Sequence, residues 1–412
     1  MKRVCWATIG VCGLLLGGGF VAVGGEQSGG FDGEGFFRVE GKRFFPVGAY
    51  DLPPGWTAKQ LGEAGFNLVR ARADRKAWDE AQAAGLKVWH SFGDGLAIES
   101  SNAEAKVKAL AQRTALLADH PALLFWESAD EPAWTDADPA RARLSPDLLA
   151  RGYGELRKLD ARHPVLINHA PRNMVETLQR YNGACDFVSV DVYPILPPGL
   201  RQMYAITPDG RHGDLPNQTP SCVGEYVRKM RRVAGPGRAV LMVLQGFAWE
   251  SLRKENERDA KAVRYPSYVE SRFMAFDAVI AGANGIFYWG FPKTPAGHPF
   301  FEQLARVTRE LRELAPAIEG NTVPNEIERR YQEMGSTIAG GVEALVRERA
   351  DGRRVLFAAN TSVDPARVTL GRLPLRGKEV RSREDGSRIV LENGAFTADY
   401  PGLGVRVFEE AE

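Results

Sequence analysis

Two carboxylates stand side by side in the stretch Phe125-Trp126-Glu127-Ser128-Ala129-Asp130-Glu131-Pro132. A carboxylic acid that is buried beside a like charge keeps its proton to a higher pH than a solvated one, so such a pair can supply a general acid. We therefore take Glu131 as the candidate general acid and Asp130 as the second candidate catalytic group. The alternative interpretation is structural, because acidic residues also favour the first turn of a helix and Asp130-Glu131-Pro132 could begin one.

The elements around this pair predict the fold. Short apolar runs typical of buried parallel strands alternate with amphipathic segments typical of helices. The runs cover residues 44–49, 67–71, 87–92, 123–126, 165–168, 187–192, 240–244 and 285–289. Two helix starts are explicit, a capping box at Thr57 with Gln60 and a cap at Ser145 followed by Pro146. Eight strands alternating with helices predict an α/β fold of the (β/α)₈ TIM-barrel type.

An open, doubly wound parallel sheet is the alternative fold. It is disfavoured because no glycine-rich phosphate loop follows any of the predicted strands.

The C-terminal part of the chain has a different sequence pattern. From about residue 321, short alternating runs are separated by turn dipeptides, which predicts a small C-terminal antiparallel β-sandwich. These dipeptides are Asp351-Gly352, Asp385-Gly386 and Asn393-Gly394. The predicted domains are a signal peptide at 1–25, a leader and β-hairpin at 26–43, a catalytic barrel at 44–320 and the sandwich at 321–412.

The start of the chain predicts export. Lys2 and Arg3 precede an apolar run over residues 4–23, and the small residues Gly24 and Gly25 follow it. We expect a secreted or periplasmic protein, with an uncleaved membrane anchor as the alternative. Once the signal has left, the mature chain keeps two cysteines, Cys185 and Cys222, which an oxidising compartment could join and which could equally remain buried thiols.

The charge balance excludes several classes of partner. The chain of 412 residues has 53 Lys and Arg against 52 Asp and Glu, with no long basic run, so we expect no nucleic-acid partner. The histidines do not fall in an H-x-x-x-H pair, so we expect no metal and no cofactor. Apart from the signal segment we expect no membrane contact, and the substrate should be neutral or weakly charged.

The predicted strand ends indicate what that substrate is. In a barrel the loops at the carboxyl ends of the strands converge on one mouth. Amides, acids, imidazoles and aromatic rings gather there, a mixture that suits the hydroxyl groups and C–H faces of a sugar. The candidate substrate-binding residues are Tyr50, His90, Asp191, Tyr193, Gln245 and Trp289.

Over roughly residues 44–314 the chain resembles the clan A glycoside hydrolases. The resemblance lies in the Asp-Glu-Pro motif at strand four, the run 45–50, the end of strand six at Asp191-Val192-Tyr193-Pro194, and the end of strand eight at Tyr288-Trp289-Gly290. It implies a glycosidase barrel with Glu131 as acid/base, here cleaving an oligo- or polysaccharide. Asp130 departs from the clan's usual Asn, and Gln245 stands near the place of its nucleophilic Glu.

Because the amide of Gln245 cannot act as a carboxylate nucleophile, the sequence leaves several other catalytic mechanisms open. Glu250 could swing back from its loop, or it is an ordinary loop charge. Asp191 or Asp94 could act as a base at the longer separation of inverting enzymes. The favoured route gives Asp130 a role, because an adjacent Asp-Glu pair resembles that of substrate-assisted hexosaminidases, in which Asp orients a 2-acetamido group. The alternative of another class is a non-catalytic carbohydrate-binding barrel.

Overall fold

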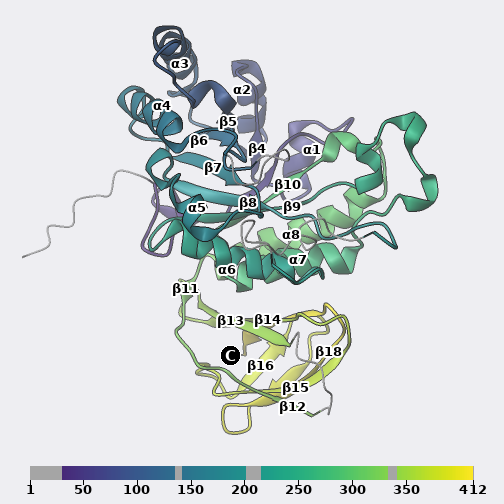
Figure 1. The fold of residues 1–412 in the computed structure, drawn as a ribbon. Helices are drawn as coiled ribbons and strands as arrows, with labels where there is room; N and C mark the ends of the chain where they lie inside the picture. The colour runs from purple at the N-terminus through teal and green to yellow at the C-terminus, as the bar shows by residue number, and fades with distance from the viewer. Residues whose placement is uncertain (1–29, 135–141, 201–214, 333–340, 412) are drawn as a thin grey trace, which may run out of the picture.

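The computed structural model describes residues 30–134, 142–200, 215–332 and 341–411. Its larger part is a closed barrel of eight parallel strands, in which β10 pairs with β3 to close the ring (Figure 1). The strands are β3 (Val47–Ala49), β4 (Leu68–Arg70), β5 (Lys87–Ser91), β6 (Leu123–Asp130), β7 (Val165–His169), β8 (Phe187–Asp191), β9 (Val240–Gln245) and β10 (Gly285–Trp289). The predicted barrel is thus confirmed, and the open doubly wound sheet is excluded.

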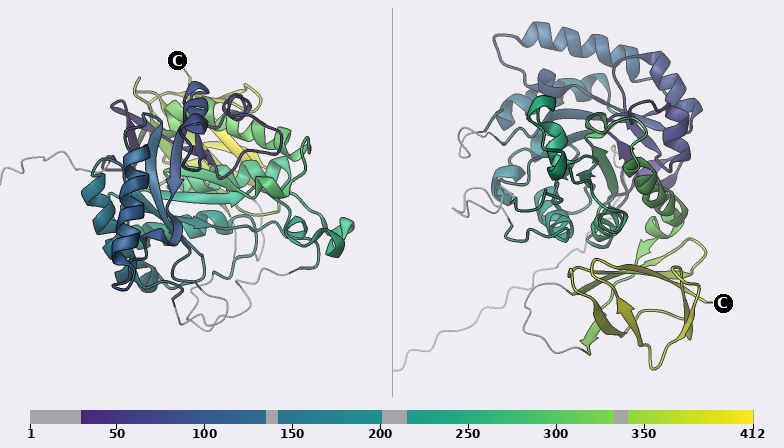
Figure 2. Two further views of the ribbon diagram at one scale, coloured as in Figure 1. Left: turned by 90° about the horizontal axis from the view of Figure 1, so that it is seen from above. Right: turned by 90° about the vertical axis from the view of Figure 1, so that its right-hand side faces the viewer.

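Helices surround the strands, as the turned views show (Figure 2). They are α1 (Ala58–Glu63), α2 (Arg75–Ala83), α3 (Ala103–Leu117), α4 (Pro146–Leu159), α5 (Val175–Gln179), α6 (Cys222–Ala234), α7 (Tyr268–Ile280) and α8 (Phe300–Ile318). Short 3₁₀ turns lie at η1 (Gly93–Leu96), η2 (Asn182–Ala184), η4 (Trp249–Leu252), η5 (Glu255–Glu257), η6 (Ala260–Ala262) and η7 (Phe291–Lys293).

Both predicted helix caps are confirmed. The Thr57 side chain accepts from the backbone N–H of Gln60, whose own side chain reaches back to the Thr57 backbone. The Ser145 hydroxyl accepts from the N–H of Asp147, with Pro146 at the first helical position. Sequence spacing therefore fixes where the helices after the first and fourth strands begin.

Alternation along each strand divides the core into two layers. The inner layer fills the barrel with aromatic rings, and Trp89 stacks on Phe287 with ring centroids 4.8 Å apart and on Phe125 with centroids 5.7 Å apart. The outer layer, between strands and helices, includes Trp78 and Trp126. Because side chains alternate along a strand, neighbours of an inner residue belong to the outer layer.

A β-hairpin packs against the start of the barrel strands. It consists of β1 (Phe37–Val39) and β2 (Lys42–Phe44), paired antiparallel. Its Phe37 ring contacts the inner rings of Phe125 and Phe187, with centroids 5.8 and 5.3 Å apart. The hairpin therefore fills the amino-terminal end of the barrel and leaves the carboxyl end as the open one.

The predicted antiparallel sandwich follows the barrel. One sheet has the order β11-β13-β14-β19-β16-β17 and the other β12-β15-β18. Their bounds are β11 (Asn321–Thr322), β12 (Glu328–Tyr331), β13 (Val342–Glu348), β14 (Arg354–Asn360), β15 (Ala366–Gly371), β16 (Glu379–Ser382), β17 (Arg388–Val390), β18 (Phe396–Tyr400) and β19 (Val405–Glu410).

Helix α7 joins the two parts of the chain. In Figure 1 the sandwich lies on the side of the barrel where α6, α7 and α8 run. Arg272 of α7 forms ion pairs with Glu310 of α8 and Glu384 of the sandwich, at 2.7 and 2.9 Å, and donates to the Val405 carbonyl. Phe276 and Phe357 pack across the same boundary. Apolar and charged contacts together hold the sandwich against the barrel.

The predictions made from the cysteines and from the start of the chain compare differently with the structure. Cys185 and Cys222 are buried thiols that are not bonded to each other, which is one of the two arrangements that the sequence left open. Burial raises the pKa of Cys185 to about 12. The predicted signal peptide at 1–25 lies outside the described residues. Within the described ranges, no helix is both long and apolar enough to cross a bilayer.

Candidate active site

Glu131 lies just past the carboxyl end of β6. Its backbone N–H donates to the carbonyl of Asn168 on β7 at 2.9 Å, and its φ of +44° turns the chain out of the strand. No helix begins here, since α4 starts only at Pro146. The helix-capping interpretation of Asp130-Glu131-Pro132 therefore does not describe this structure.

Asp191, the last residue of β8, forms a side-chain hydrogen bond with Glu131. Burial, the nearby charges of Glu131 and Asp130, and this hydrogen bond hold the pKa of Asp191 well above its usual range. Two carboxyl groups in contact cannot both ionise without strong repulsion, so the pair retains a proton that either oxygen can carry.

A single amide aligns this pair with Asp130. The Nδ2 of Asn168 donates to Asp130 Oδ1 at 2.9 Å and to Asp191 Oδ1 at 3.0 Å. Its Oδ1 accepts from the Ser189 hydroxyl at 2.7 Å, which fixes the orientation of the amide. Two carboxyl groups from two strands thus share one amide, and the backbone N–H of Glu131 bonds to the carbonyl of Asn168, while Asp130 itself is exposed. We call Asp130, Glu131 and Asp191 the carboxyl cluster.

One of the inverting arrangements considered from the sequence, that of Asp191 with Glu131, does not match this geometry. An inverting pair needs carboxyl groups roughly 6.5 to 9.5 Å apart, whereas Asp191 and Glu131 are in hydrogen-bond contact. Asp94 is ion-paired with Arg143 at 2.7 Å and its side chain is 59% exposed. Glu250 is buried and accepts from the Asp259 N–H at 2.7 Å, so it holds its own loop.

The structure adds a fourth carboxyl group, Glu127, that was not predicted as a site residue. It is buried inside the barrel, where it accepts from the Trp89 indole N–H at 3.1 Å and from the Tyr50 hydroxyl at 3.4 Å. Burial and the charge of Asp130 raise the pKa of Glu127 to about 7, although the charge of Arg70 acts in the opposite direction. A carboxyl group that is half protonated near neutral pH therefore lies beneath the cluster.

Tyr50 is one of the predicted residues that the structure brings to this group. Burial and the neighbouring carboxylates of Glu127, Asp130 and Asp191 raise its pKa, so the phenol stays a donor. The Arg70 guanidinium lies over the Tyr50 ring, 4.8 Å from its centroid.

Aromatic rings form the other side of the mouth. Tyr193 and Trp289 stack with centroids 5.7 Å apart and an interplanar angle of 23°. Phe247 meets both rings edge-on, and the Trp249 indole donates to the Tyr193 carbonyl at 3.1 Å. Trp289 is only partly buried. Tyr193 and Trp289, two of the predicted substrate-binding residues, therefore belong to one aromatic cluster at the ends of β8, β9 and β10.

Comparison with solved structures agrees with this architecture. A GH27 β-L-arabinopyranosidase from Geobacillus stearothermophilus is similar with a TM-score of 0.54 at 10% identity, over 89% of this chain and 96% of that chain. A family 39 glycoside hydrolase from Bacteroides cellulosilyticus WH2 is similar with a TM-score of 0.50 at 13% identity, over 89% and 81%. The fold is that of glycoside hydrolase barrels. No protein-family model and no curated protein sequence matches this chain.

Two of the predicted substrate-binding residues lie outside the mouth clusters. His90 faces the outer layer among Trp78, Phe92 and Trp126, and its Nδ1 lies 2.8 Å from the Ala71 carbonyl. Burial lowers its pKa. Its neighbour Trp89 takes the inner position, so alternation along β5 turns His90 away from the mouth.

Gln245 is directed inward but is fully engaged with the backbone. Its Oε1 accepts from the Ile195 N–H at 2.9 Å, and its Nε2 donates to the carbonyls of Ile195 and Phe247 at 2.9 and 3.0 Å. The side chain clamps the loop after β8 to the end of β9, and it is 1% exposed. Both N–H donors of this amide are used, so a ligand could take one only by breaking the clamp.

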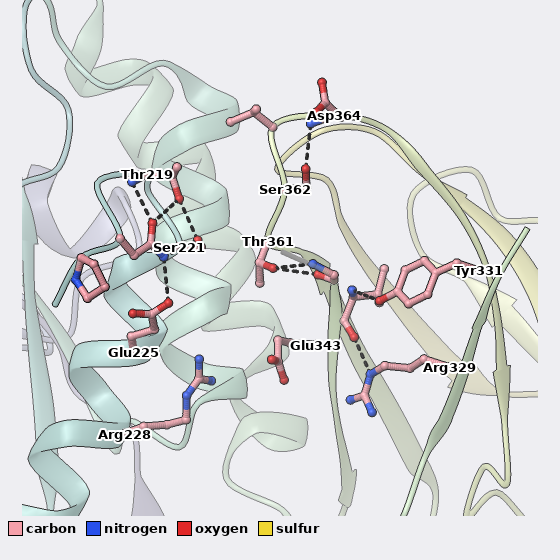
Figure 3. Close-up of a pocket in the computed structure, with 15 residues that line it drawn as sticks. Thr219, Ser221, Glu225, Arg228, Arg329, Tyr331, Glu343, Thr361, Ser362 and Asp364 are labelled. Carbon is pink, nitrogen blue, oxygen red and sulfur yellow. Dashed lines mark hydrogen bonds between the residues drawn. The ribbon is translucent and has the colours of Figure 1, made fainter. Parts of the chain in front are cut away.

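A separate groove of about 850 Å³ lies between the start of α6 and the sandwich (Figure 3). The polar side chains on the α6 wall bond to one another, with Asn217 donating to Ser221 and Glu225 at 2.9 Å. The facing wall carries Thr361, which exchanges hydrogen bonds with Gly341. This groove is lined by none of the carboxyl cluster.

Proposed function

We propose that this chain is a glycoside hydrolase in which Glu131 is the general acid. The observation that carries the proposal is the hydrogen bond between Glu131 and the buried Asp191, at the mouth of a barrel of the glycosidase type. A glycosidic oxygen is a poor leaving group unless it is protonated, and a carboxyl pair that keeps its proton above the usual pKa range of a carboxylic acid can supply that proton.

In the proposed reaction the proton moves from Glu131 to the glycosidic oxygen as the C1–O bond breaks. Asp191 is the more buried member of the pair, so its part is to share the retained proton with Glu131 and to position the Glu131 carboxyl group through the hydrogen bond between them. After the leaving group departs, the Glu131 carboxylate takes a proton from the attacking water. Proton and charge therefore balance over one cycle without a second carboxylate at Gln245.

In the favoured, substrate-assisted form of the reaction, Asp130 orients the 2-acetamido group of the sugar. The carbonyl oxygen of a 2-acetamido group attacks C1, and Asp130 accepts the hydrogen bond of the amide N–H, which strengthens as the carbonyl oxygen gives up electron density. Asn168 already fixes one oxygen of Asp130, so the carboxylate is oriented before a sugar binds. Water then opens the cyclic intermediate.

The aromatic cluster suits the apolar face of the sugar. Trp289 is the partly exposed member of its stack with Tyr193, and a ring so held presents a rigid platform to C–H groups. We further propose that the chain is exported through the segment 1–25, which would place the enzyme with extracellular or periplasmic glycans.

Turnover of unactivated oligosaccharides by the full chain tests the proposal. Glu131→Gln should abolish cleavage while the glycan still binds, and Asp130→Asn should reduce cleavage of 2-acetamido substrates strongly. Glu104→Gln, at an exposed position on α3, is the matched control and should retain full activity. Equal turnover by the wild type and Glu131→Gln would refute the assignment of the acid. Equal cleavage of glucosides and 2-acetamido sugars would refute the substrate-assisted form alone.

A second candidate function is a non-catalytic carbohydrate-binding barrel. It is favoured by one observation, the engagement of Gln245 with the backbone at the place where a nucleophilic carboxylate would stand. This alternative predicts saturable glycan binding with no turnover, and binding that Glu131→Gln leaves unchanged.

A further inference from the structure

A second cavity lies at the opposite end of the barrel from the carboxyl cluster. It measures about 640 Å³ and is bounded by the loops that lead into β9 and β10 and by the sandwich strands β11 and β13. Three arginines and one carboxylate line it: Arg231, Arg232, Arg347 and Glu34. We call it the arginine cavity.

The one carboxylate is already neutralised. Glu34 lies 2.8 Å from Arg347 and 3.2 Å from Arg43, and its Oε2 accepts from the Thr322 hydroxyl at 2.6 Å. Although burial opposes ionisation, these contacts hold the pKa of Glu34 below its usual range, so it is a carboxylate. It can balance only one of the positive charges around it.

Arg231 has no carboxylate partner among the described residues. Its guanidinium donates to the carbonyls of Gly282 and Arg238 and to the Asn284 side chain, all of them neutral acceptors. Burial and the repulsion of Arg347 lower its pKa to about 10. The carboxyl end of α6 contributes only about half a negative charge, so the lining keeps a positive excess.

Arg347 has donors to spare. Its residue is 4% exposed, and its Nη1 is used by Glu34, Gly320 and Thr322. Its Nε has no hydrogen-bond partner in the described part of the chain, and its guanidinium lies over the Phe36 ring, 5.3 Å from the centroid. Arg232, at the last turn of α6, is exposed beside it. Because Arg347 is paired with Glu34, the positive excess in the lining comes from Arg231 and Arg232.

We propose that the arginine cavity binds an oxyanion of the sulfate or phosphate class. Arg347 and Arg232 donate charge-assisted hydrogen bonds to its oxygens, and Arg231 adds positive charge from behind. Planar guanidinium groups match such tetrahedral oxyanions well. The anion bridges α6 of the barrel and β13 of the sandwich. This inference does not depend on the proposed glycosidase activity.

Titration calorimetry of the full chain with sodium sulfate tests it, against sodium chloride at equal ionic strength. The wild type should bind sulfate saturably, and Arg232→Ala should weaken binding about 10-fold, as expected for one lost charge-assisted hydrogen bond. Arg347→Lys keeps the charge beside Glu34 but loses the planar fork, so it should also weaken binding. Arg151→Ala, at an exposed arginine of α4, is the control and should bind as the wild type does.

A second titration separates the sources of the anion. Glucose 6-sulfate that binds at least 10-fold tighter than inorganic sulfate assigns the cavity to a glycan-borne sulfate, whereas equal or weaker binding assigns it to the free ion; both outcomes support the site. Absence of saturable sulfate binding by the wild type, or the same affinity in Arg232→Ala and Arg151→Ala, would overturn the proposal.

Discussion

Replacing Gln245 by glutamate puts a carboxylate near the position where the resemblance to clan A enzymes places a nucleophile, and the structure predicts damage rather than gain. The Gln245 amide donates to two backbone carbonyls, those of Ile195 and Phe247, from a position that is 1% exposed. In Q245E one oxygen of the new carboxyl group faces those same carbonyl oxygens. The new carboxyl group must either stay ionised, without these hydrogen bonds and repelled by the carbonyl oxygens, or take up a proton.

Protonation sets the upper limit of the cost. An unperturbed glutamate has a pKa of about 4.3, so keeping it neutral at pH 7 costs about 3.7 kcal/mol, from 2.7 pH units at ~1.36 kcal/mol each. The neutral acid has one O–H in place of two N–H donors, so one hydrogen bond is lost at about 1 kcal/mol. The free energy of unfolding should therefore fall by about 4 to 5 kcal/mol at pH 7.

The pH dependence identifies the cause. The folded state of Q245E raises the pKa of the introduced carboxyl group, so it keeps a proton that the unfolded chain releases above about pH 4.3. The stability deficit relative to the wild type should then grow as pH rises, by about 2.7 kcal/mol between pH 5 and pH 7. Other titrating groups cancel in this difference.

Urea unfolding followed by tryptophan fluorescence at pH 5 and pH 7 measures both quantities. Q82E is the matched control, because Gln82 is exposed on α2 and the same change there should cost little. If Q245E is as stable as Q82E at both pH values, or if it acquires glycosidase turnover, the clamp reasoning is refuted and the side chain is free to enter the mouth.

Three further predictions follow from contacts described above. Because the pKa of Glu127 is about 7 in the fold against 4.5 for an ordinary glutamate, the stability of the wild type relative to E127Q should fall by about 3 kcal/mol from pH 4.5 to pH 7 in urea unfolding. R272A should lower the free energy of unfolding by about 2 to 3 kcal/mol, because Glu310 and Glu384 lose their shared partner, and thermal unfolding with limited proteolysis between barrel and sandwich should show it. W289A should raise the Kd for a bound oligosaccharide about 10-fold with a smaller change in kcat, measured by calorimetry and turnover.

The barrel could be predicted from the sequence because its signals are local. Each strand is a short apolar run, and caps such as those at Thr57 and Ser145 mark helix starts within four residues. The segment between β7 and β8 carries no such signal, because Met174 precedes α5 without a capping hydrogen bond from its side chain. Only Val175–Gln179 is α-helical, and a 3₁₀ turn follows at Asn182–Ala184. Such short helices and turns depend on contacts with residues distant in the sequence. The periodicity of apolar residues does not reveal those contacts.

The direction of side chains at the strand ends was harder to predict. In a parallel barrel both faces of a strand are buried and apolar, so the pattern does not reveal which residues face inward. That is why His90 was predicted at the mouth while Trp89 holds the inner position. One signal was present: counting in twos from the inner Phe125 reaches Glu127, which the structure places beneath the carboxyl cluster.

The role of Asn168 was also out of reach, because it depends on two strands at once. Its amide meets Asp130 from β6 and Asp191 from β8, and no spacing in the sequence encodes that meeting. The catalytic role of the carboxyl cluster is a prediction. The fold itself brings the three residues of the cluster together at one end of the barrel.

The segment around Glu34 has a consequence for the order of folding. It emerges from the ribosome early, yet its partners Thr322 and Arg347 are 288 and 313 residues further along the chain. Contacts of such long separation close late and slow folding. The segment around Glu34 can therefore form these contacts only after the sandwich strands have been synthesised. This connection between the barrel and the sandwich is then completed late in folding.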